Sequence, residues 1–380
     1  MTSSTTGDAQ QPVLFQTIRT ASGQKFGHAT LNSPASLHAL SLPMVKLLDQ
    51  QLEIWATDPE IVGVILDGAG EKAFCAGGDV VSLCHAIREN PKGKVPQLAY
   101  DFFSREYRLD YRIHTYNKPV ICWAHGIVMG GGVGLMAGAS HRVVTPKTRL
   151  AMPEITIGLY PDVGGSWILA RLPGKIGPFL AMTGASINAA DALYAGLADH
   201  ALPVESRTAV IEAIQCAKWN GDKESDANQI TQLLRKFSHE TVLPDSKLCE
   251  HFERINQAVG DDGFMNACQR VMAFSSDPDP WLSTAGQTLS KGSPTSAALG
   301  LTMQERARDL SLAETFQLEL QASMGCCVYP DFAEGVRALL VDKDKNPNWQ
   351  PKTHGEVTTE WIAGHLVPRF EGSNPLIDLH

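Results

Sequence analysis

The chain has 380 residues, which is long for one typical domain and short for three, so two units are expected, or one large unit with an appendage. Hydrophobic residues make up 43% and charged residues 19%, enough apolar material for a sizeable core, which excludes a wholly disordered chain. The net charge of −9 argues against a nucleic-acid partner, and the lack of a long apolar run argues against a membrane span.

The N-terminus and the cysteines bear on cellular location. Residues 1–12 are rich in Ser, Thr and Gln and lack the basic start, apolar stretch and arginines of targeting segments, so a disordered polar tail is expected. The eight cysteines include no CxxC pair and no metal-ligand spacing with histidine, and several lie in apolar segments, as buried thiols do. A cytoplasmic location and no metal site are therefore expected.

Short apolar strands alternate with helical patterns over the first half of the chain. Strands are predicted over residues 13–18, 25–31, 61–66, 120–124, 143–145 and 149–152, and helices over 43–57, 96–116 and 166–172. Such alternation predicts an α/β fold. Helical patterns dominate after about residue 206, so we expect a core over 13–205 and a mainly helical C-terminal region over 206–380 packed on it.

Clusters of glycine follow two of the predicted strands. Ala76-Gly77-Gly78-Asp79 follows the strand over 61–66, and Gly130-Gly131-Gly132-Val133-Gly134 follows the strand over 120–124. A strand that ends in glycines and opens a helix leaves backbone N–H groups unpaired, and two such turns could aim two N–H groups at one oxygen. The alternative is that the glycines only permit tight helix–strand packing, and for either cluster alone the two interpretations are evenly balanced.

Three carboxylates are notable for their position. Glu154 directly follows a short apolar strand, and Asp162 lies in a Pro/Gly turn before the helix predicted over 166–172. On spacing alone, ordinary roles are favoured for both, a solvated loop residue for Glu154 and a helix N-cap for Asp162. Glu106 lies on the apolar face of the helix predicted over 96–116, where a carboxylate needs partners or has a raised pKa. A buried salt bridge to an arginine and a functional role are weighted equally for it.

Taken together, three motifs resemble the enoyl-CoA hydratase/isomerase (crotonase) superfamily. They are Ala73-Phe74-Cys75-Ala76-Gly77-Gly78-Asp79, His125-Gly126-Ile127-Val128-Met129-Gly130-Gly131-Gly132, and Met152-Pro153-Glu154 with Gly158, in family order and spacing. Further stretches resemble the branch that hydrolyses 3-hydroxyisobutyryl-CoA, namely Gly158 to Gly165, Ser293-Pro294-Thr295-Ser296, Asp331 to Ala338 and Asp342-Lys343-Asp344. The resemblance covers nearly the whole chain and implies a crotonase-like spiral of ββα units with a helical C-terminal region.

The resemblance assigns two binding roles to the glycine clusters and their neighbours. Backbone N–H groups at Gly78 and Gly131 would bind the thioester carbonyl oxygen of the substrate. The chain at Ala39, Gly77, Gly78 and Asp79 would flank the coenzyme A arm. Coenzyme A is part of the substrate, so no separate cofactor is expected.

The resemblance also assigns roles to the three carboxylates. Glu154 falls at the catalytic glutamate, Asp162 matches the aspartate of the hydrolases, and Glu106 matches their substrate-contacting glutamate. Gly134 stands where a two-glutamate hydratase has its other glutamate, and this loss favours thioester hydrolysis over hydration. His38 stands where the family often has asparagine, which leaves the detail of the coenzyme pocket open.

The resemblance therefore predicts hydrolysis of 3-hydroxyisobutyryl-CoA, with 3-hydroxypropionyl-CoA as a related substrate, in valine catabolism. Activation of water by Glu154 and attack by Glu154 to form a mixed anhydride both stay open. The alternatives are an enoyl-CoA hydratase or isomerase with a single glutamate, and a CoA-binding scaffold without catalysis. Crotonases commonly assemble as trimers or hexamers, which leaves a homo-oligomer open.

Overall fold

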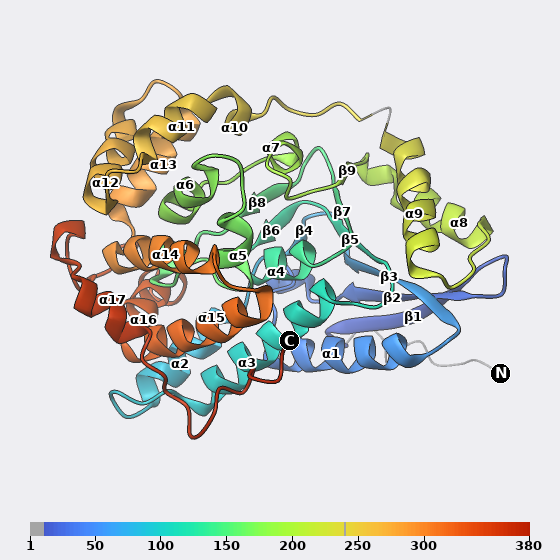
Figure 1. Ribbon diagram of the computed structural model, residues 1–380, viewed down its shortest axis with the longest axis horizontal. Helices are drawn as coiled ribbons and strands as arrows, with labels where there is room; N and C mark the ends of the chain where they lie inside the picture. Colours follow the sequence, from blue (N-terminus) through green and yellow to red (C-terminus); the bar gives the residue numbers. More distant parts are fainter. Residues whose placement is uncertain (1–10, 239–240) are drawn as a thin grey trace. The chain divides into compact units, whose positions relative to one another are not determined.

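The computed structural model describes residues 11–238 and 241–380 (Figure 1). All but the last two residues of the expected tail over 1–12 lie outside the described residues. The chain divides into two compact units: unit 1 is Met1–Gly78, Arg112–Leu150 and Asn188–Asp245, and unit 2 is Asp79–Tyr111, Ala151–Ile187 and Ser246–His380. The two units interleave along the sequence, so the predicted division at residue 205 falls inside the last segment of unit 1.

Unit 1 is built on a six-stranded sheet in the order β1-β2-β3-β5-β7-β9 (Figure 1). Its strands are β1 (Val13–Arg19), β2 (Lys25–Leu31), β3 (Ile61–Gly68), β5 (Val120–Ala124), β7 (His141–Val144) and β9 (His200–Ala201). β1 and β2 are antiparallel, and the other neighbours pair in parallel. A second sheet contains β4 (Ala73–Cys75), β6 (Ile127–Met129) and β8 (Arg149–Ala151), and the last residue of β8 belongs to unit 2.

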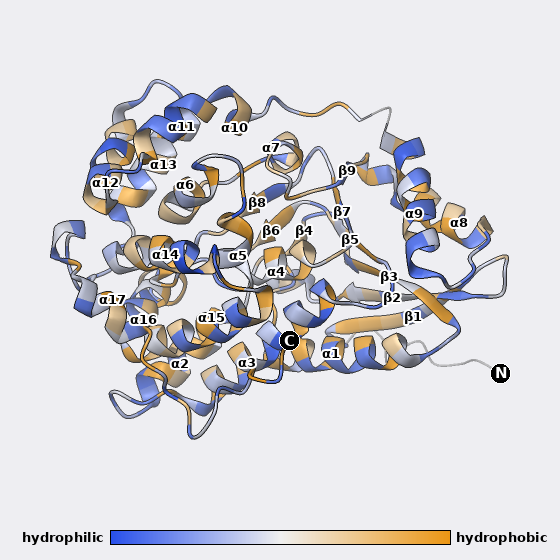
Figure 2. Ribbon diagram, in the orientation of Figure 1, coloured by the Kyte–Doolittle hydropathy of each residue, from blue (hydrophilic) through white to orange (hydrophobic). Residues whose placement is uncertain are grey.

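The six-stranded sheet has an apolar core because its strands are hydrophobic and helices pack on them. Every residue of β3 is buried, as its nearly continuous apolar run predicts, and Figure 2 shows hydrophobic colour along most of it. The helices α8 (Arg207–Cys216) and α9 (Lys223–Ser238) contribute to a core cluster that includes Phe26 and Trp123 of the strands. The remaining helices of unit 1 are α1 (Leu42–Thr57), α4 (Gly131–Ala137) and α7 (Ala189–Tyr194).

Unit 2 is mainly helical. Its helices are α2 (Val80–Glu89), α3 (Gln97–His114), α5 (Gly165–Leu169), α6 (Ile176–Thr183), α10 (Lys247–Glu250), α11 (Phe252–Val259), α12 (Phe264–Ala273), α13 (Pro280–Lys291), α14 (Pro294–Ala307), α15 (Leu312–Val328), α16 (Pro330–Val336) and α17 (Thr359–His365). The last three residues of α3 belong to unit 1. A short 3-10 helix, η3 (Glu154–Ile157), follows β8.

These elements form the α/β fold that the sequence predicts, and most predicted boundaries agree with the structure to within two residues. The exception is the helix predicted over 166–172, which is observed as α5 and ends at Leu169. Pro173 disfavours helical backbone at the residue before it, so the turn toward Pro173 shortens this helix. None of the described helices is both long enough and apolar enough to cross a bilayer.

Candidate active site

The two glycine clusters lie side by side in unit 1. The strands β4 and β6 pair in parallel, with Cys75 opposite Val128, so the segments that follow the two strands leave the sheet at the same edge. A Cβ at Gly132 would lie 2.4 Å from the carbonyl oxygen of Cys75, so only glycine permits this approach of α4 to β4. Gly77 has a φ of +110°, a backbone conformation that a residue with a side chain rarely adopts. The glycines are therefore required by the backbone path, and they place the segments at Gly77–Gly78 and Gly130–Gly132, the glycine turns, next to each other.

The glycine turns present two backbone N–H groups that the sequence analysis selected. Gly131 is the first residue of α4, where an N–H has no intrahelical acceptor. The Leu40 N–H donates to the Gly77 carbonyl at 2.7 Å in a parallel bridge between Leu40 and Gly78. Among the described residues, no backbone carbonyl outside the helices and strands accepts from the Gly78 N–H. Two such donors in neighbouring turns of unit 1 are an arrangement that can bind one negatively charged oxygen.

The segment at Ala39 is held against the first glycine turn by the backbone hydrogen bond from Leu40 to Gly77, and the His38 ring joins this segment to other turns of unit 1. His38 has a φ of +59°, and its buried ring accepts from the Ser33 N–H at Nδ1 (2.9 Å). Its Nε2 lies 2.9 Å from the carbonyl oxygen of Ala69, which can only accept, so the ring carries its proton on Nε2. Burial lowers the pKa of His38, in agreement with this neutral form. The histidine at this position is thus a structural latch between two turns of unit 1.

Of the four residues predicted to flank coenzyme A, Asp79 lies in unit 2, and its carboxylate caps a helix. Oδ1 accepts from the Ser82 N–H at 3.2 Å, and the Ser82 hydroxyl donates to Oδ2 at 2.6 Å. This is the usual role of an aspartate at the residue before the first helical turn. The side chain of Asp79 therefore fixes the start of α2.

Glu154, Asp162 and Glu106 are all buried in unit 2, with exposed fractions of 4%, 4% and 2%. The solvated loop residue that spacing favoured for Glu154 is wrong, because η3 carries this side chain into the interior. None of the ion pairs between described residues involves Glu106, so the predicted salt bridge to an arginine is also wrong. The buried carboxyls of unit 2 gather without a cationic partner, which is costly unless the arrangement serves function.

Burial changes the charge state of these three carboxyls. It raises the pKa of Glu154 and of Glu106 well above the ordinary glutamate value, and the charge of Asp162 acts in the same direction on both. Burial also raises the pKa of Asp162 to about 6, while a hydrogen bond from Tyr107 acts in the opposite direction. Perturbed carboxyls that influence one another are typical of acid–base sites, although structural networks also produce them.

The turn that carries Asp162 is held by residues far away in the sequence. The N-cap interpretation of Asp162 is wrong, because α5 begins at Gly165 and its N-cap residue is Gly164. The carboxylate of Glu319 instead accepts from the N–H groups of Gly164 (2.8 Å) and Ser166 (3.0 Å). The side chain of Asp162 is left to accept from the Tyr107 hydroxyl at 2.6 Å. The N–H groups at the start of α5 thus find their acceptor on α15, which leaves the side chain of Asp162 available for another role.

Sequence reasoning missed a fourth buried carboxyl, Asp110. It is fully buried, and neither of its oxygens has a hydrogen-bond partner among the described residues. Burial, with Glu106 next, raises the pKa of Asp110 well above the ordinary value. A usable signal was present, since Asp110 follows Glu106 by one helical turn and so shares its apolar face. We call Glu106, Asp110, Glu154 and Asp162 the carboxylate cluster.

The C-terminal motifs clamp the 3-10 helix that carries Glu154. The Ser293 N–H donates to the carbonyl of Ile155 at 3.0 Å, and the Ser293 hydroxyl donates to Asp331 at 2.6 Å. A Cβ at Gly158, whose φ is +74°, would lie 2.1 Å from the carbonyl oxygen of Asp331. A Cβ at Gly335 would lie 2.4 Å from the backbone of η3. The Ser293 and Asp331 stretches therefore position Glu154 from within unit 2.

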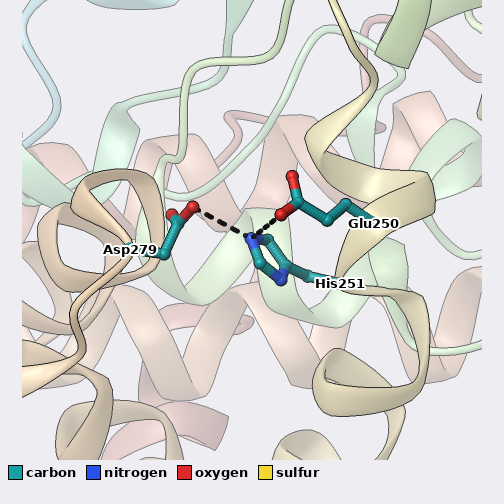
Figure 3. Close-up of side chains that lie close together, drawn as sticks. All are labelled: Glu250, His251 and Asp279. Atoms are coloured by element: carbon teal, nitrogen blue, oxygen red, sulfur yellow. Dashed lines mark ion pairs between the residues drawn. The ribbon is translucent and has the colours of Figure 1, made fainter.

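One group of described residues outside the carboxylate cluster has metal-ligating side chains close together. The ligand atoms of Glu250, His251 and Asp279 lie within 4.8 Å of one another (Figure 3). The Lys247 ammonium, however, lies 2.8 Å from Glu250 and 3.0 Å from Asp279, so a cation already neutralises both carboxylates. Asp279 also caps α13 by accepting from the N–H groups of its first turn. We interpret this group as an ion-pair cluster.

Comparison with known proteins gives concordant matches over most of the chain. The family model for enoyl-CoA hydratase/isomerase matches residues 26–366. The 3-hydroxyisobutyryl-CoA hydrolase, mitochondrial, of Gallus gallus is 40% identical over 354 residues, which cover 92% of this chain and 88% of that protein. The Homo sapiens protein of the same name is 38% identical over 344 residues, which cover 90% of this chain and 86% of that protein.

Two solved structures have the same fold as this chain. A carnitinyl-CoA dehydratase from Mycobacterium thermoresistibile aligns with a TM-score of 0.82 and 34% identity over 94% of this chain and 97% of its own. An enoyl-CoA hydratase from Rhodobacter sphaeroides aligns with a TM-score of 0.80 and 32% identity over 94% of this chain and 98% of its own. The helical C-terminal half is therefore included in the shared architecture.

Proposed function

Because the chain belongs to the enoyl-CoA hydratase/isomerase family, we propose that it hydrolyses the thioester of 3-hydroxyisobutyryl-CoA to 3-hydroxyisobutyrate and free coenzyme A. The observation that carries this proposal is the 40% identity, over 92% of the chain, to a protein named as a 3-hydroxyisobutyryl-CoA hydrolase. Gly134 in place of a second glutamate and the buried Asp162 support hydrolysis over hydration.

In this proposal the glycine turns form an oxyanion hole. The carbonyl oxygen of a thioester gains negative charge when a nucleophile attacks its carbon. The N–H groups of Gly78 and Gly131 bind that oxygen, and removal of one such donor typically costs about 2.7–4 kcal/mol of barrier. The support for these roles is the requirement for glycine in both turns and their adjacency in unit 1.

The carboxylate cluster supplies the acid–base chemistry. Glu154 either takes a proton from the attacking water or itself attacks the carbonyl carbon to form a mixed anhydride that water then opens. In both routes the C–S bond breaks and the sulfur leaves with a proton. A buried carboxyl with a raised pKa is a stronger base once ionised, which supports the first role. Asp162 holds the 3-hydroxyl of the substrate or assists proton transfer, and Glu106 positions substrate or water.

The remaining roles follow the same resemblance. Ala39, Gly77, Gly78 and Asp79 flank the coenzyme A arm, and no separate cofactor takes part because coenzyme A belongs to the substrate. The reaction is a step of valine catabolism. We propose a cytoplasmic location, supported by eight cysteines that are all thiols, although the relatives are named as mitochondrial. Separation of cytosol from organelles, followed by detection of the protein, tests this location.

A panel of acyl-CoA thioesters followed by free-thiol release tests the function. We expect fastest release from 3-hydroxyisobutyryl-CoA, with 3-hydroxypropionyl-CoA the first related substrate to compare. The second candidate is hydration or isomerisation of an enoyl-CoA, since the Rhodobacter sphaeroides protein of the same fold is named as an enoyl-CoA hydratase. Loss of enoyl absorbance without thiol release would support that candidate. Tight acyl-CoA binding with neither reaction would support a scaffold that has lost catalysis.

A further inference from the structure

Asp162 stands at one end of a chain of buried oxygens in unit 2. Its Oδ2 lies 2.6 Å from the Tyr107 hydroxyl, which lies 2.6 Å from the Ser323 hydroxyl. The Ser323 hydroxyl lies 3.0 Å from the Tyr160 hydroxyl, which donates to the carbonyl oxygen of Glu319 at 2.7 Å. All of these groups are buried, so the four contacts must be satisfied by one another.

The number of protons in this chain depends on the charge of Asp162. Each of the four oxygen–oxygen contacts is a hydrogen bond only if a proton lies between its atoms. The three hydroxyls of Tyr107, Ser323 and Tyr160 supply three protons, and the carbonyl of Glu319 supplies none. With Asp162 ionised, one of the four contacts therefore has no proton. With Asp162 protonated, four protons serve four contacts and every hydrogen bond points from Asp162 toward Glu319.

We propose that this hydroxyl chain favours the protonated form of Asp162 over its carboxylate, which prepares Asp162 to donate a proton in the reaction. The inference rests on the proposed function for the assignment of Asp162 to the reaction. Tyr107, Ser323 and Tyr160 are positioning residues that act through Asp162. Ser323 is the hub, because it touches both tyrosine hydroxyls and has one proton to give.

The negative charge of an ionised Asp162 raises the pKa of the neighbouring carboxyls, and a proton on Asp162 would relieve that repulsion. The carboxyls that interact with it are Glu106 and Asp110 from α3, Glu154 from η3 and Glu319 from α15. Burial raises the pKa of Asp162 to about 6, and the causes of its shift include no Lys or Arg. Hydrogen bonds from the Tyr107 hydroxyl and from the backbone favour the carboxylate of Asp162, but Tyr107 can donate to Asp162 only while one Ser323 contact lacks a proton.

Removal of a hydroxyl beyond Tyr107 should make Asp162 easier to ionise. Tyr160→Phe removes the hydroxyl beyond Ser323, which frees the Ser323 proton for Tyr107 and the Tyr107 proton for an ionised Asp162. The midpoint of Asp162 ionisation should fall by about one pH unit, the worth of one hydrogen bond. Ser323→Ala should act like Tyr160→Phe and replaces it if that variant is unstable.

The first measurement needs no substrate. Infrared spectra follow the carbonyl stretch of protonated carboxyls as pH rises, and subtraction of Asp162→Asn spectra isolates Asp162. We expect a wild-type midpoint near pH 6 and a lower one in both Tyr160→Phe and Ser323→Ala. Tyr116→Phe is the matched control, because it removes a buried hydroxyl that donates to the Leu52 carbonyl elsewhere, and it should leave the midpoint in place.

The second measurement is the pH dependence of kcat/KM for free-thiol release from 3-hydroxyisobutyryl-CoA. The part of this profile that reports the ionisation of Asp162 should shift in the same direction as the infrared midpoint. An unchanged or raised midpoint in Tyr160→Phe and Ser323→Ala overturns the proposal. Lowered infrared midpoints in a protein that releases no thiol from any acyl-CoA would support the hydroxyl chain and refute the proposed hydrolysis. The two ideas can therefore fail separately.

Discussion

The glycine turns of unit 1 and the carboxylate cluster of unit 2 are specified in different ways. In the glycine turns the chemistry is backbone N–H, and its geometry follows from residues close in sequence that admit no side chain, such as Gly132 against Cys75. In the carboxylate cluster the chemistry is in side chains, and their geometry depends on contacts such as that of Glu319 with Gly164, 155 residues apart. A backbone site is therefore sensitive to added volume, and a side-chain site to charge.

The largest expected effect comes from a change of charge without volume in the carboxylate cluster. Glu154→Gln should lower kcat for thioester hydrolysis by about 10²–10⁴-fold, the usual worth of a general acid or base. Free-thiol release at saturating substrate measures it. The exposed Glu305→Gln is the matched control and should keep the parent rate. Hydrolysis at the parent rate in Glu154→Gln would remove Glu154 from the mechanism.

A change of volume without charge tests the glycine turns. Gly132→Ala places a Cβ 2.4 Å from the Cys75 carbonyl oxygen, so α4 must move away from β4 and carry the Gly131 N–H with it. We expect kcat to fall by about 10²–10³-fold, as for loss of one oxyanion donor. Gly355→Ala is the control, because its Cβ would make ordinary contact at 3.7 Å with Met265. Equal kcat in both alanine variants would contradict the role of the turn.

The same contrast explains what the sequence could predict. The strands and the glycine turns carry local signals, because apolar runs and glycines report on their own backbone. The burial of Glu106 was also readable from helical periodicity, and Asp110 could have been found by extending the same face by one turn. The N-cap interpretation of Asp162 failed because the carboxylate that accepts those N–H groups comes from α15, and a contact between distant segments leaves no local pattern.

The pH dependence of stability tests the burial of Asp162. Its pKa is about 6 in the folded protein against an ordinary 3.8, so the folded state holds a proton that the unfolded state releases. The free energy of unfolding should therefore fall as pH rises between about 4 and 6, by about 3 kcal/mol from this group. Denaturant unfolding across that range should show a weaker fall in Asp162→Asn than in the parent. The exposed Asp309→Asn is the control and should leave the slope unchanged.

The smallest expected effect separates conformation from hydrogen bonding at the latch beside the first glycine turn. His38→Asn suits the φ of +59°, because asparagine adopts left-handed backbone readily, but it loses the hydrogen bond to Ala69. These effects oppose each other, so the free energy of unfolding should change by less than about 1 kcal/mol. His38→Ala loses both the side chain suited to left-handed backbone and the ring hydrogen bonds, so the free energy of unfolding should fall by about 2 kcal/mol. The KM for acyl-CoA should rise because the segment at Ala39 is no longer held. If both variants destabilise equally, the backbone conformation contributes nothing and the two ring hydrogen bonds account for the latch. Denaturant unfolding of the pair measures the difference, and thiol-release kinetics reports whether the segment at Ala39 has moved.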